Sequence, residues 1–219
     1  MKTTSRSFLS TIAVICAASA AVDAGVFNAN FNDGMVPLGS AVWGNAVVEP
    51  TGGVNNSGCL KLTKNEGSQQ GSFVIDDLDG GAPVYGFRVS MKVRVGGGTV
   101  PPADGWSFCV APDLPDAAWG EEGTGTGLTL AFDTYDNGGG EAPAIDLKIG
   151  NQVIVSKKVP IGDISTDDQY APVVIAVNPD GSLDLEYNGK VHFSKFYFPN
   201  YQPLAFARFG FGARTGGAT

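Results

Sequence analysis

One short stretch of the chain concentrates side chains that could hold a metal ion. It runs from Gly127 to Glu141 and reads GLTLAFDTYDNGGGE. An apolar, strand-like run leads directly into two aspartates, an asparagine, three glycines and a glutamate. Carboxylate, amide and carbonyl oxygens are the donors that calcium prefers, and it takes about six to eight of them. The first chemistry to consider is therefore calcium binding.

The spacing of these residues indicates how the donors would converge. Alternate side chains of an extended backbone project to one side. Asp133, Tyr135 and Asn137 therefore share a side, which brings two oxygen side chains and a backbone carbonyl near Tyr135 to the end of the strand. The glycines that follow let the chain curl so that Glu141 closes the shell. The alternative is a solvated acidic turn that merely ends a strand.

The elements that position this stretch are predicted to be β-strands. Of the 219 residues, 31 are glycine, about twice the usual share, and glycine disfavours helix interiors. About thirteen short β-branched and aromatic runs, from Val26–Phe31 to Leu204–Gly212, are separated by Gly, Pro, Asn and Asp. This pattern predicts an all-β sandwich or barrel, because no window shows helical periodicity. Without an internal repeat or linker, one domain is expected.

One predicted hairpin is specific enough to predict its register. It spans Leu183–Phe193 and contains the turn dipeptide Asn-Gly. A three-residue loop from Tyr187 to Gly189, with the glycine as a left-handed bulge, would pair Leu185 with Val191. This register keeps one face of the hairpin apolar, whereas a two-residue turn mixes polar and apolar side chains on both faces. We therefore predict the three-residue loop.

The beginning of the chain has the pattern of a secretory signal peptide. A basic start with Lys2 and Arg6 precedes an apolar stretch that ends at Val22, and small residues follow. That stretch is short for a membrane span, and no later segment approaches ~20 apolar residues. We expect a signal peptide at residues 1–24, a single domain at 25–219, and a secreted protein, extracellular or periplasmic, without a membrane span.

Charge and cysteine content also bear on the class of protein. The formal charge is 14 − 22 = −8, and an acidic surface argues against a nucleic-acid partner, whose phosphates need basic groups.

Two cysteines follow the signal peptide, Cys59 and Cys109. In an exported protein they could form one disulfide, or each could be a buried free thiol in a strand. Both alternatives remain open at this point.

Three segments carry a resemblance to a known family. In chain order they are ADGWSF at 103–108, FDTYDN at 132–137 and GFGARTGG at 210–217. This set resembles the signature of the concanavalin-like L-type lectins, and is most similar to the calcium-only, cargo-receptor branch of that legume-lectin-like family. The resemblance covers roughly residues 100–217. It implies a two-sheet antiparallel jelly-roll sandwich, the concanavalin A-like lectin/glucanase fold.

The resemblance also assigns roles to residues at matching positions. Asp104, after a cis bond from Ala103, would accept hydrogen bonds from sugar hydroxyls. Asn137 would serve both calcium and sugar, and Gly216 or Gly217 would offer backbone N–H groups to the sugar. The implied calcium ligands are Asp133, the Tyr135 carbonyl, Asn137 and Glu141, with Asp136 as a ligand of a second ion.

Some positions depart from the family pattern. The glutamate that legume lectins place two residues before the metal-binding aspartate is Ala131 here, and no histidine follows Glu141 at the matching place. The manganese half of the legume metal pair is therefore expected to be absent, which leaves calcium as the only cofactor. The chain stops at Thr219, where the family continues into a closing strand. We expect the domain to lack its final strand, which would expose a sheet edge.

Two tryptophans are candidates for the aromatic surface on which a sugar could stack. Trp106 sits in a predicted strand and is interpreted as core. Trp119 lies in the loop Pro112–Thr126, where it is either a sugar platform or a packing residue. Glu121 and Glu122 share that loop and are interpreted as solvated acids.

The function predicted from these features is a secreted, calcium-dependent carbohydrate-binding domain without catalytic activity, whose partners are glycans or polysaccharide. One alternative is a structural or adhesion module that binds no sugar. The other is a glycoside hydrolase, which needs two facing carboxylates. Asp184 and Glu186 have the alternation of such an acidic strand but also that of an ordinary hairpin. The single histidine, His192, is interpreted as the polar side of a strand.

Overall fold

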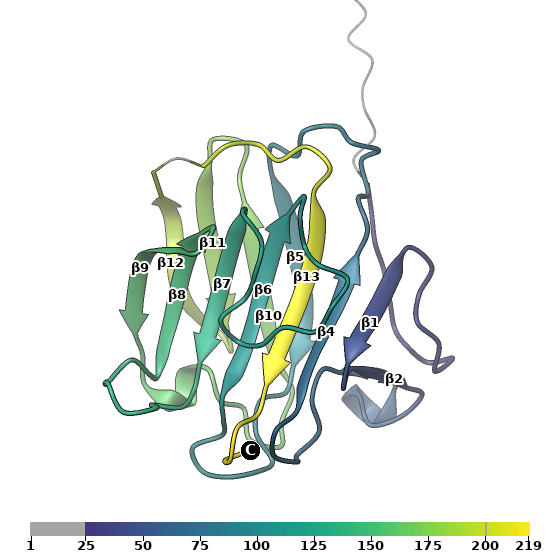
Figure 1. Cartoon of the computed structure of the whole chain (residues 1–219), viewed down its shortest axis with the longest axis vertical. Coiled ribbons are helices and arrows are strands. Elements are labelled where there is room, and N and C mark those ends of the chain that lie inside the picture. Colours follow the sequence, from purple (N-terminus) through teal and green to yellow (C-terminus); the bar gives the residue numbers. More distant parts are fainter. Residues whose placement is uncertain (1–24, 200) are drawn as a thin grey trace, which may run out of the picture.

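The protein is an all-β sandwich of two antiparallel sheets, as the sequence predicts. The computed structural model describes residues 25–199 and 201–219, so the predicted signal peptide lies outside the described residues. Figure 1 shows the larger sheet in front and the smaller one behind it. Within the described residues there is no α-helix, and the two short 3₁₀ turns span Val54–Asn56 and Ile161–Asp163.

The larger sheet has seven strands and the smaller has four. In spatial order the larger sheet consists of β1 (Ser40–Gly44), β4 (Gln70–Ile75), β13 (Arg208–Arg214), β6 (Gly105–Ala111), β7 (Leu128–Asp133), β8 (Ala144–Ile149) and β9 (Gln152–Lys158). The smaller sheet consists of β12 (Lys190–Tyr197), β11 (Ser182–Tyr187), β10 (Ala171–Val177) and β5 (Phe87–Val93). A separate ribbon pairs β2 (Val47–Glu49) with β3 (Cys59–Lys61). Strands distant in sequence are thus neighbours, as in a jelly roll.

The core lies between the two sheets and contains a stack of aromatic rings. Trp106 on β6 lies parallel to Phe132 on β7, with ring centroids 4.1 Å apart. Tyr187 on β11 contacts Phe132 from the opposite sheet at 5.5 Å, and its hydroxyl donates to the Ile164 carbonyl. The expected core role of Trp106 is confirmed, since only 5% of it is exposed.

The predicted register of the β11–β12 hairpin is wrong. Asn188 and Gly189 form a two-residue turn with φ of 51° and 72°, and Tyr187 pairs with Lys190. An irregularity then skips His192. Tyr187 is buried in the core and therefore cannot belong to the loop. The bulge at His192 restores the apolar face of the hairpin, which the two-residue turn alone would disrupt.

His192, the extra residue at this bulge, is buried rather than on the polar side of a strand, and its Nε2 has no partner within the described residues. Burial, together with the Lys157 and Lys190 cations and against the Asp163 charge, holds the pKa of His192 below its ordinary 6.5. The unfolded chain therefore binds this proton more readily, so we expect stability to fall as the pH falls through about 6.5.

The measurement for His192 is urea unfolding at about pH 7.5 and about pH 5.5 for wild type and His192→Gln. The loss of unfolding free energy on acidification should be smaller in the variant, because glutamine does not titrate. Equal losses in the two proteins would mean that another group is responsible.

Three other sequence-based expectations concern the segment 26–31, the two cysteines and a membrane span. Val26–Phe31, expected as a strand, is not in any sheet. Cys59 and Cys109 are both free and buried, in different sheets, so the disulfide alternative is not realised. Within the part of the chain that the structure describes, no helix has the length and apolar character needed to cross a membrane.

Candidate functional site

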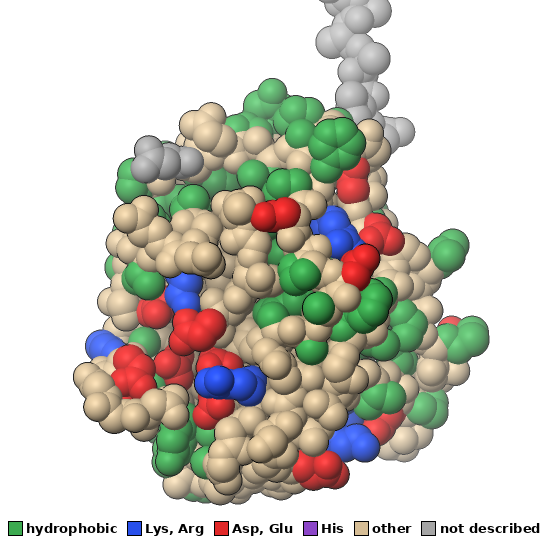
Figure 2. All heavy atoms as spheres, in the orientation of Figure 1, with side chains coloured by type: hydrophobic (Ala, Val, Ile, Leu, Met, Phe, Trp, Pro, Cys, Tyr) green, Lys and Arg blue, Asp and Glu red, His purple; other side chains and the backbone are tan. Residues whose placement is uncertain are grey.

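A hollow of about 560 Å³ lies at the end of the larger sheet where β7 and β13 end. It gathers residues from segments far apart in sequence. The residues that line it are Ser68, Gln69, Gln70, Asp104, Tyr135, Asn137, Arg214, Thr215, Gly216, Gly217 and Ala218. All four of the predicted sugar-binding residues other than Trp119 are among them. Figure 2 shows acidic and basic side chains gathered over the lower left of this sheet face.

Asp104 is held at the start of β6 by its backbone and by an arginine. The Ala103–Asp104 bond is cis, as the resemblance implied. The Asp104 N–H donates to the Arg214 carbonyl at 2.8 Å, and its carbonyl accepts from Thr134 at 2.9 Å. The Asp104 side chain is 6% exposed, and Arg214 Nε lies 3.0 Å from Oδ2. The carboxylate is therefore fixed in place and partly neutralised.

Gly216 and Gly217 bring bare backbone to the same hollow. The Gly216 carbonyl accepts from Ser68 at 2.9 Å, which anchors the loop. A Cβ built on Gly216 would lie 3.2 Å from both Asp104 carboxylate oxygens, whereas one on Gly217 would meet nothing within 4 Å. Within the described residues neither glycine N–H has an acceptor, so both are available to a ligand.

The predicted calcium ligands begin at the last residue of β7. Tyr135 N–H donates to Asp133 Oδ1 at 3.1 Å, and Asn137 Nδ2 donates to the Tyr135 carbonyl at 3.4 Å. The Asp133 carboxylate therefore lies beside the Tyr135 N–H, and the Asn137 amide lies beside the Tyr135 carbonyl. Burial, assisted by the charges of Glu122 and Glu121, raises the pKa of Asp133 to about 6, against the effect of the Tyr135 amide.

The glycine-rich loop closes on itself through its acids. Glu141 Oε1 accepts from Asn137 N–H at 2.5 Å, so the curl expected from the glycines is present. Asp136 Oδ1 accepts the N–H groups of Gly138, Gly139 and Gly140 at 2.8 to 2.9 Å. These bonds lower the pKa of Asp136 to about 2. The Asp136 carboxylate is thus directed to the loop amides.

The donor chemistry fits a hard cation, although not as a carboxylate cluster. Among residues 25–199 and 201–219, no three His, Cys, Asp or Glu side chains are grouped to hold a metal ion. The set at Asp133, Tyr135 and Asn137 mixes one carboxylate with a carbonyl and an amide, which are ordinary calcium donors. A carboxylate whose charged form is disfavoured by burial would gain from a neighbouring cation.

Trp119 is not the exposed sugar platform that the sequence allowed. It is 5% exposed and packs in a small cluster with Val74 and Leu114. A Cβ on Gly210 or Gly212 would lie 2.7 Å or 2.3 Å from the Trp119 ring. The glycines of β13 thus leave space for the indole to lie flat on the outer face of the sheet, where it acts as core.

The site contains two residues whose roles were missed from the sequence. Arg214 bridges two acids, because its Nη2 atom also lies 2.6 Å from Glu121 Oε1. Glu121 is 3% exposed and not solvated as expected, and burial raises its pKa. Glu122, by contrast, is largely exposed and pairs with Lys148. Arg214 stands within the GFGARTGG segment, but nothing in that segment indicated an acidic partner.

The acidic strand considered for a hydrolase has a structural explanation. Asp184 accepts from Asn178 Nδ2 at 2.8 Å and from Lys195 N–H at 2.7 Å. These bonds link β11 to the β10–β11 turn and to β12, and they lower the pKa of Asp184. Glu186 is exposed. Both lie in the smaller sheet, whereas the hollow belongs to the larger one.

The two-sheet sandwich has the fold of L-type, legume-lectin-like domains, including those of cargo receptors. No protein-family model matches the chain, and no curated protein matches it. The VIP36 exoplasmic/lumenal domain, bound to Ca²⁺ and Man3GlcNAc, is similar with a TM-score of 0.57 and 16% identity, over 81% of this chain and 78% of that one. The Emp47p carbohydrate recognition domain gives 0.57 and 19%, over 85% of each chain. A Bauhinia forficata lectin in complex with GalNAc gives 0.57 and 17%, over 85% and 90%.

Proposed function

We propose that this protein is a calcium-dependent carbohydrate-binding domain that acts outside the cytoplasm and catalyses no reaction. The observation that carries the proposal is the convergence of Asp104, Asn137, Gly216 and Gly217 in one hollow. These residues come from three segments: strands β6 and β7 lie between Asp104 and Asn137, and β8 to β13 lie between Asn137 and Gly216. The similar structures support the ligand class, because two of them hold a mannose-containing oligosaccharide or GalNAc.

The chemistry of the hollow suits a sugar. Each sugar hydroxyl is both a donor and an acceptor, so a sugar needs a fixed acceptor beside fixed donors. The Asp104 carboxylate would accept from neighbouring hydroxyls, while the unpaired N–H groups of Gly216 and Gly217 would donate. Asn137 offers an amide that does either. Because these groups are anchored before binding, little conformational entropy is lost when the sugar binds.

Calcium would be held by the Asp133 carboxylate, the Tyr135 carbonyl, the Asn137 amide and Glu141, and Asp136 in the same loop would be a ligand of a second ion. Bound there, calcium would supply positive charge that fixes Asn137 for the sugar. The chain's own contribution is to place Asp133 at the ordered end of β7 and to hold the loop by its internal hydrogen bonds. Signal-peptide-directed export to an extracellular or periplasmic space would provide the calcium.

The contrast between the two glycines gives a sharp test of the sugar position. We expect Gly216→Ala to weaken glycan binding by about tenfold, or ~1.4 kcal/mol, because its methyl group would lie against both Asp104 oxygens. Gly217→Ala has open space and should bind nearly as wild type does. Affinities from calorimetry with the same glycan decide the matter, and equal effects of the two substitutions would place the sugar elsewhere.

A structural module without sugar binding is the second candidate, and one observation favours it. Arg214 already occupies part of the Asp104 carboxylate, as it would in a site that serves only stability. A glycan array probed with residues 25–219 in calcium buffer separates the two candidates. Binding to at least one glycan class is expected from the lectin proposal, and a blank array would favour the structural one.

A further inference from the structure

Arg214 is shared between two buried carboxylates, and its contacts with them differ. Its Nη2 donates to Glu121 Oε1 at 2.6 Å. With Asp104 it makes an ion pair, in which Nε lies 3.0 Å from Oδ2, and within the described residues neither Asp104 oxygen accepts a side-chain hydrogen bond. The Asp104 and Glu121 side chains are 6% and 4% exposed, against 45% for Arg214. The hydrogen bond of this cation therefore goes to Glu121, although Arg214 also lines the hollow beside Asp104.

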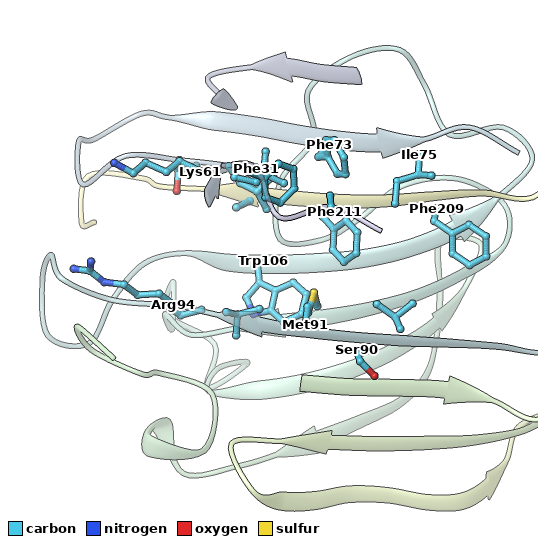
Figure 3. Close-up of a pocket in the computed structure, with 18 of the residues that line it drawn as sticks. Phe31, Lys61, Phe73, Ile75, Ser90, Met91, Arg94, Trp106, Phe209 and Phe211 are labelled. Atoms are coloured by element: carbon cyan, nitrogen blue, oxygen red, sulfur yellow. The ribbon is translucent and has the colours of Figure 1, made fainter. Parts of the chain in front are cut away.

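The alternation of β13 directs Arg214 to the outer face of the larger sheet. Figure 3 shows the rings of Phe209 and Phe211 directed into the apolar cavity between the two sheets. Successive residues of a strand face opposite sides, so Arg214, three positions after Phe211, faces the loop between β6 and β7. A Cβ built on Gly120 in that loop would lie 3.0 Å from the Arg214 Cβ. The loop thus packs on the stem of the arginine and places Glu121, the next residue, at its head group.

Glu121 has a second acceptor that is not used. Its Oε2 is buried and has no hydrogen-bond partner within the described residues. Burying a carboxylate oxygen without a partner is costly, so an arrangement that supplies an N–H is favoured. The Nε–H of Arg214 would supply one, because an arginine can bind both oxygens of one carboxylate through two parallel N–H groups. Arg214 can therefore leave Asp104 without losing an acceptor.

Asp104 would bind Arg214 in the same bidentate way if Glu121 did not compete for it. Both Asp104 oxygens face the backbone of Gly216, since a Cβ built there would lie 3.2 Å from each of them. These are the oxygens that a sugar in the hollow would use. Two parallel N–H bonds from Arg214 would compete with sugar hydroxyls at both oxygens.

We propose that Glu121 is a positioning residue of the sugar hollow: it holds Arg214 away from bidentate pairing with Asp104 and so keeps both Asp104 oxygens open to sugar hydroxyls. When a sugar binds Asp104, Arg214 transfers its Nε–H to the unused Oε2 of Glu121. This inference rests on the proposed function, and it adds to the site a residue that acts on the ligand only through Arg214.

Glu121→Gln tests this role at constant side-chain size. Glutamine is neutral, so Arg214 is drawn to the Asp104 carboxylate, and we expect glycan affinity in saturating calcium to fall about tenfold. Glu122→Gln is the matched control, because Glu122 is the next residue but is largely exposed and pairs with Lys148. It should bind the glycan as wild type does. A crystal structure of Glu121→Gln without sugar should place Arg214 Nη2 within about 3 Å of Asp104 Oδ1.

The double variant Glu121→Gln/Arg214→Met separates this role from simple support of the loop. Methionine has an unbranched stem and no N–H, so it leaves Asp104 open, and glycan affinity should return to within about threefold of wild type. A double variant as weak as the single one would overturn the inference, as would Arg214 remaining off Asp104 in the crystal structure of Glu121→Gln. Unchanged affinity of Glu121→Gln beside a wild type that binds refutes this role alone. A wild type that binds no glycan refutes the proposed function, and the role of Glu121 with it.

Discussion

Asp133→Ala is expected to lose calcium binding and, with it, glycan binding. Asp133 is the only charged donor of the set that stands on a strand, and its Oδ1 is fixed by the Tyr135 N–H. Calcium affinity follows the number of charged ligands, so we expect a loss of about a hundredfold or more. Calcium titration calorimetry measures the first effect, and glycan titration in calcium measures the second.

The metal-free variant should remain folded. Burial raises the pKa of Asp133 from 3.8 to about 6, so without a cation the stability of wild type falls as the pH rises from about 4 to about 6. The Asp133→Ala substitution removes this pH-dependent loss of stability. Glu186→Ala, an exposed acid on the other sheet, is the control and should bind calcium normally. Wild-type calcium affinity in Asp133→Ala would show that the loop is not the calcium site.

Asp104→Asn is expected to separate the two ligands. A hydrogen bond to a charged group contributes about 1.5–3 kcal/mol. Replacing the Asp104 carboxylate with a neutral amide weakens the hydrogen bonds that it would accept from the sugar hydroxyls, so glycan affinity should fall by about a hundredfold. Calcium affinity should change by less than about threefold, because Asp104 donates no oxygen to the proposed calcium set. The amide preserves size, and Arg214 keeps its contact with Glu121, so the fold should survive.

The outcome for Asp104→Asn is informative in both directions. If glycan affinity is unchanged, the carboxylate serves only to hold Arg214 and the hollow does not bind sugar through it. If calcium and glycan binding fall together, Asp104 acts by organising the calcium loop and not by contacting the sugar. The lectin proposal requires the glycan effect alone.

Much of the fold was predictable because it depends on local patterns. Short β-branched runs between glycines and asparagines indicate strands, whichever strands they pair with. The place of Trp106 in such a run indicates that it belongs to the core. The sheet order was not predictable, since β13 inserts between β4 and β6. The hairpin register failed for a related reason: the burial of Tyr187 is a tertiary requirement that turn preferences do not contain.

The site residues were likewise predictable only where a short local motif contains them. Residues on short motifs, such as Asp104 and Asn137, were correctly expected near one another. Trp119 and Glu121 were not placed correctly, because their positions depend on how the loop 112–126 folds over the sheet. A tryptophan or glutamate in a polar loop gives no sign that glycines on a distant strand leave room for it, or that Arg214 will meet it.

The most direct test of the account is calorimetric titration of an array-selected glycan into the mature protein, first in calcium, then after chelation, and again after calcium is restored. We predict saturable heat of glycan binding in calcium, none after chelation, and full recovery when calcium is restored. Equal glycan binding in the presence and absence of calcium would contradict it.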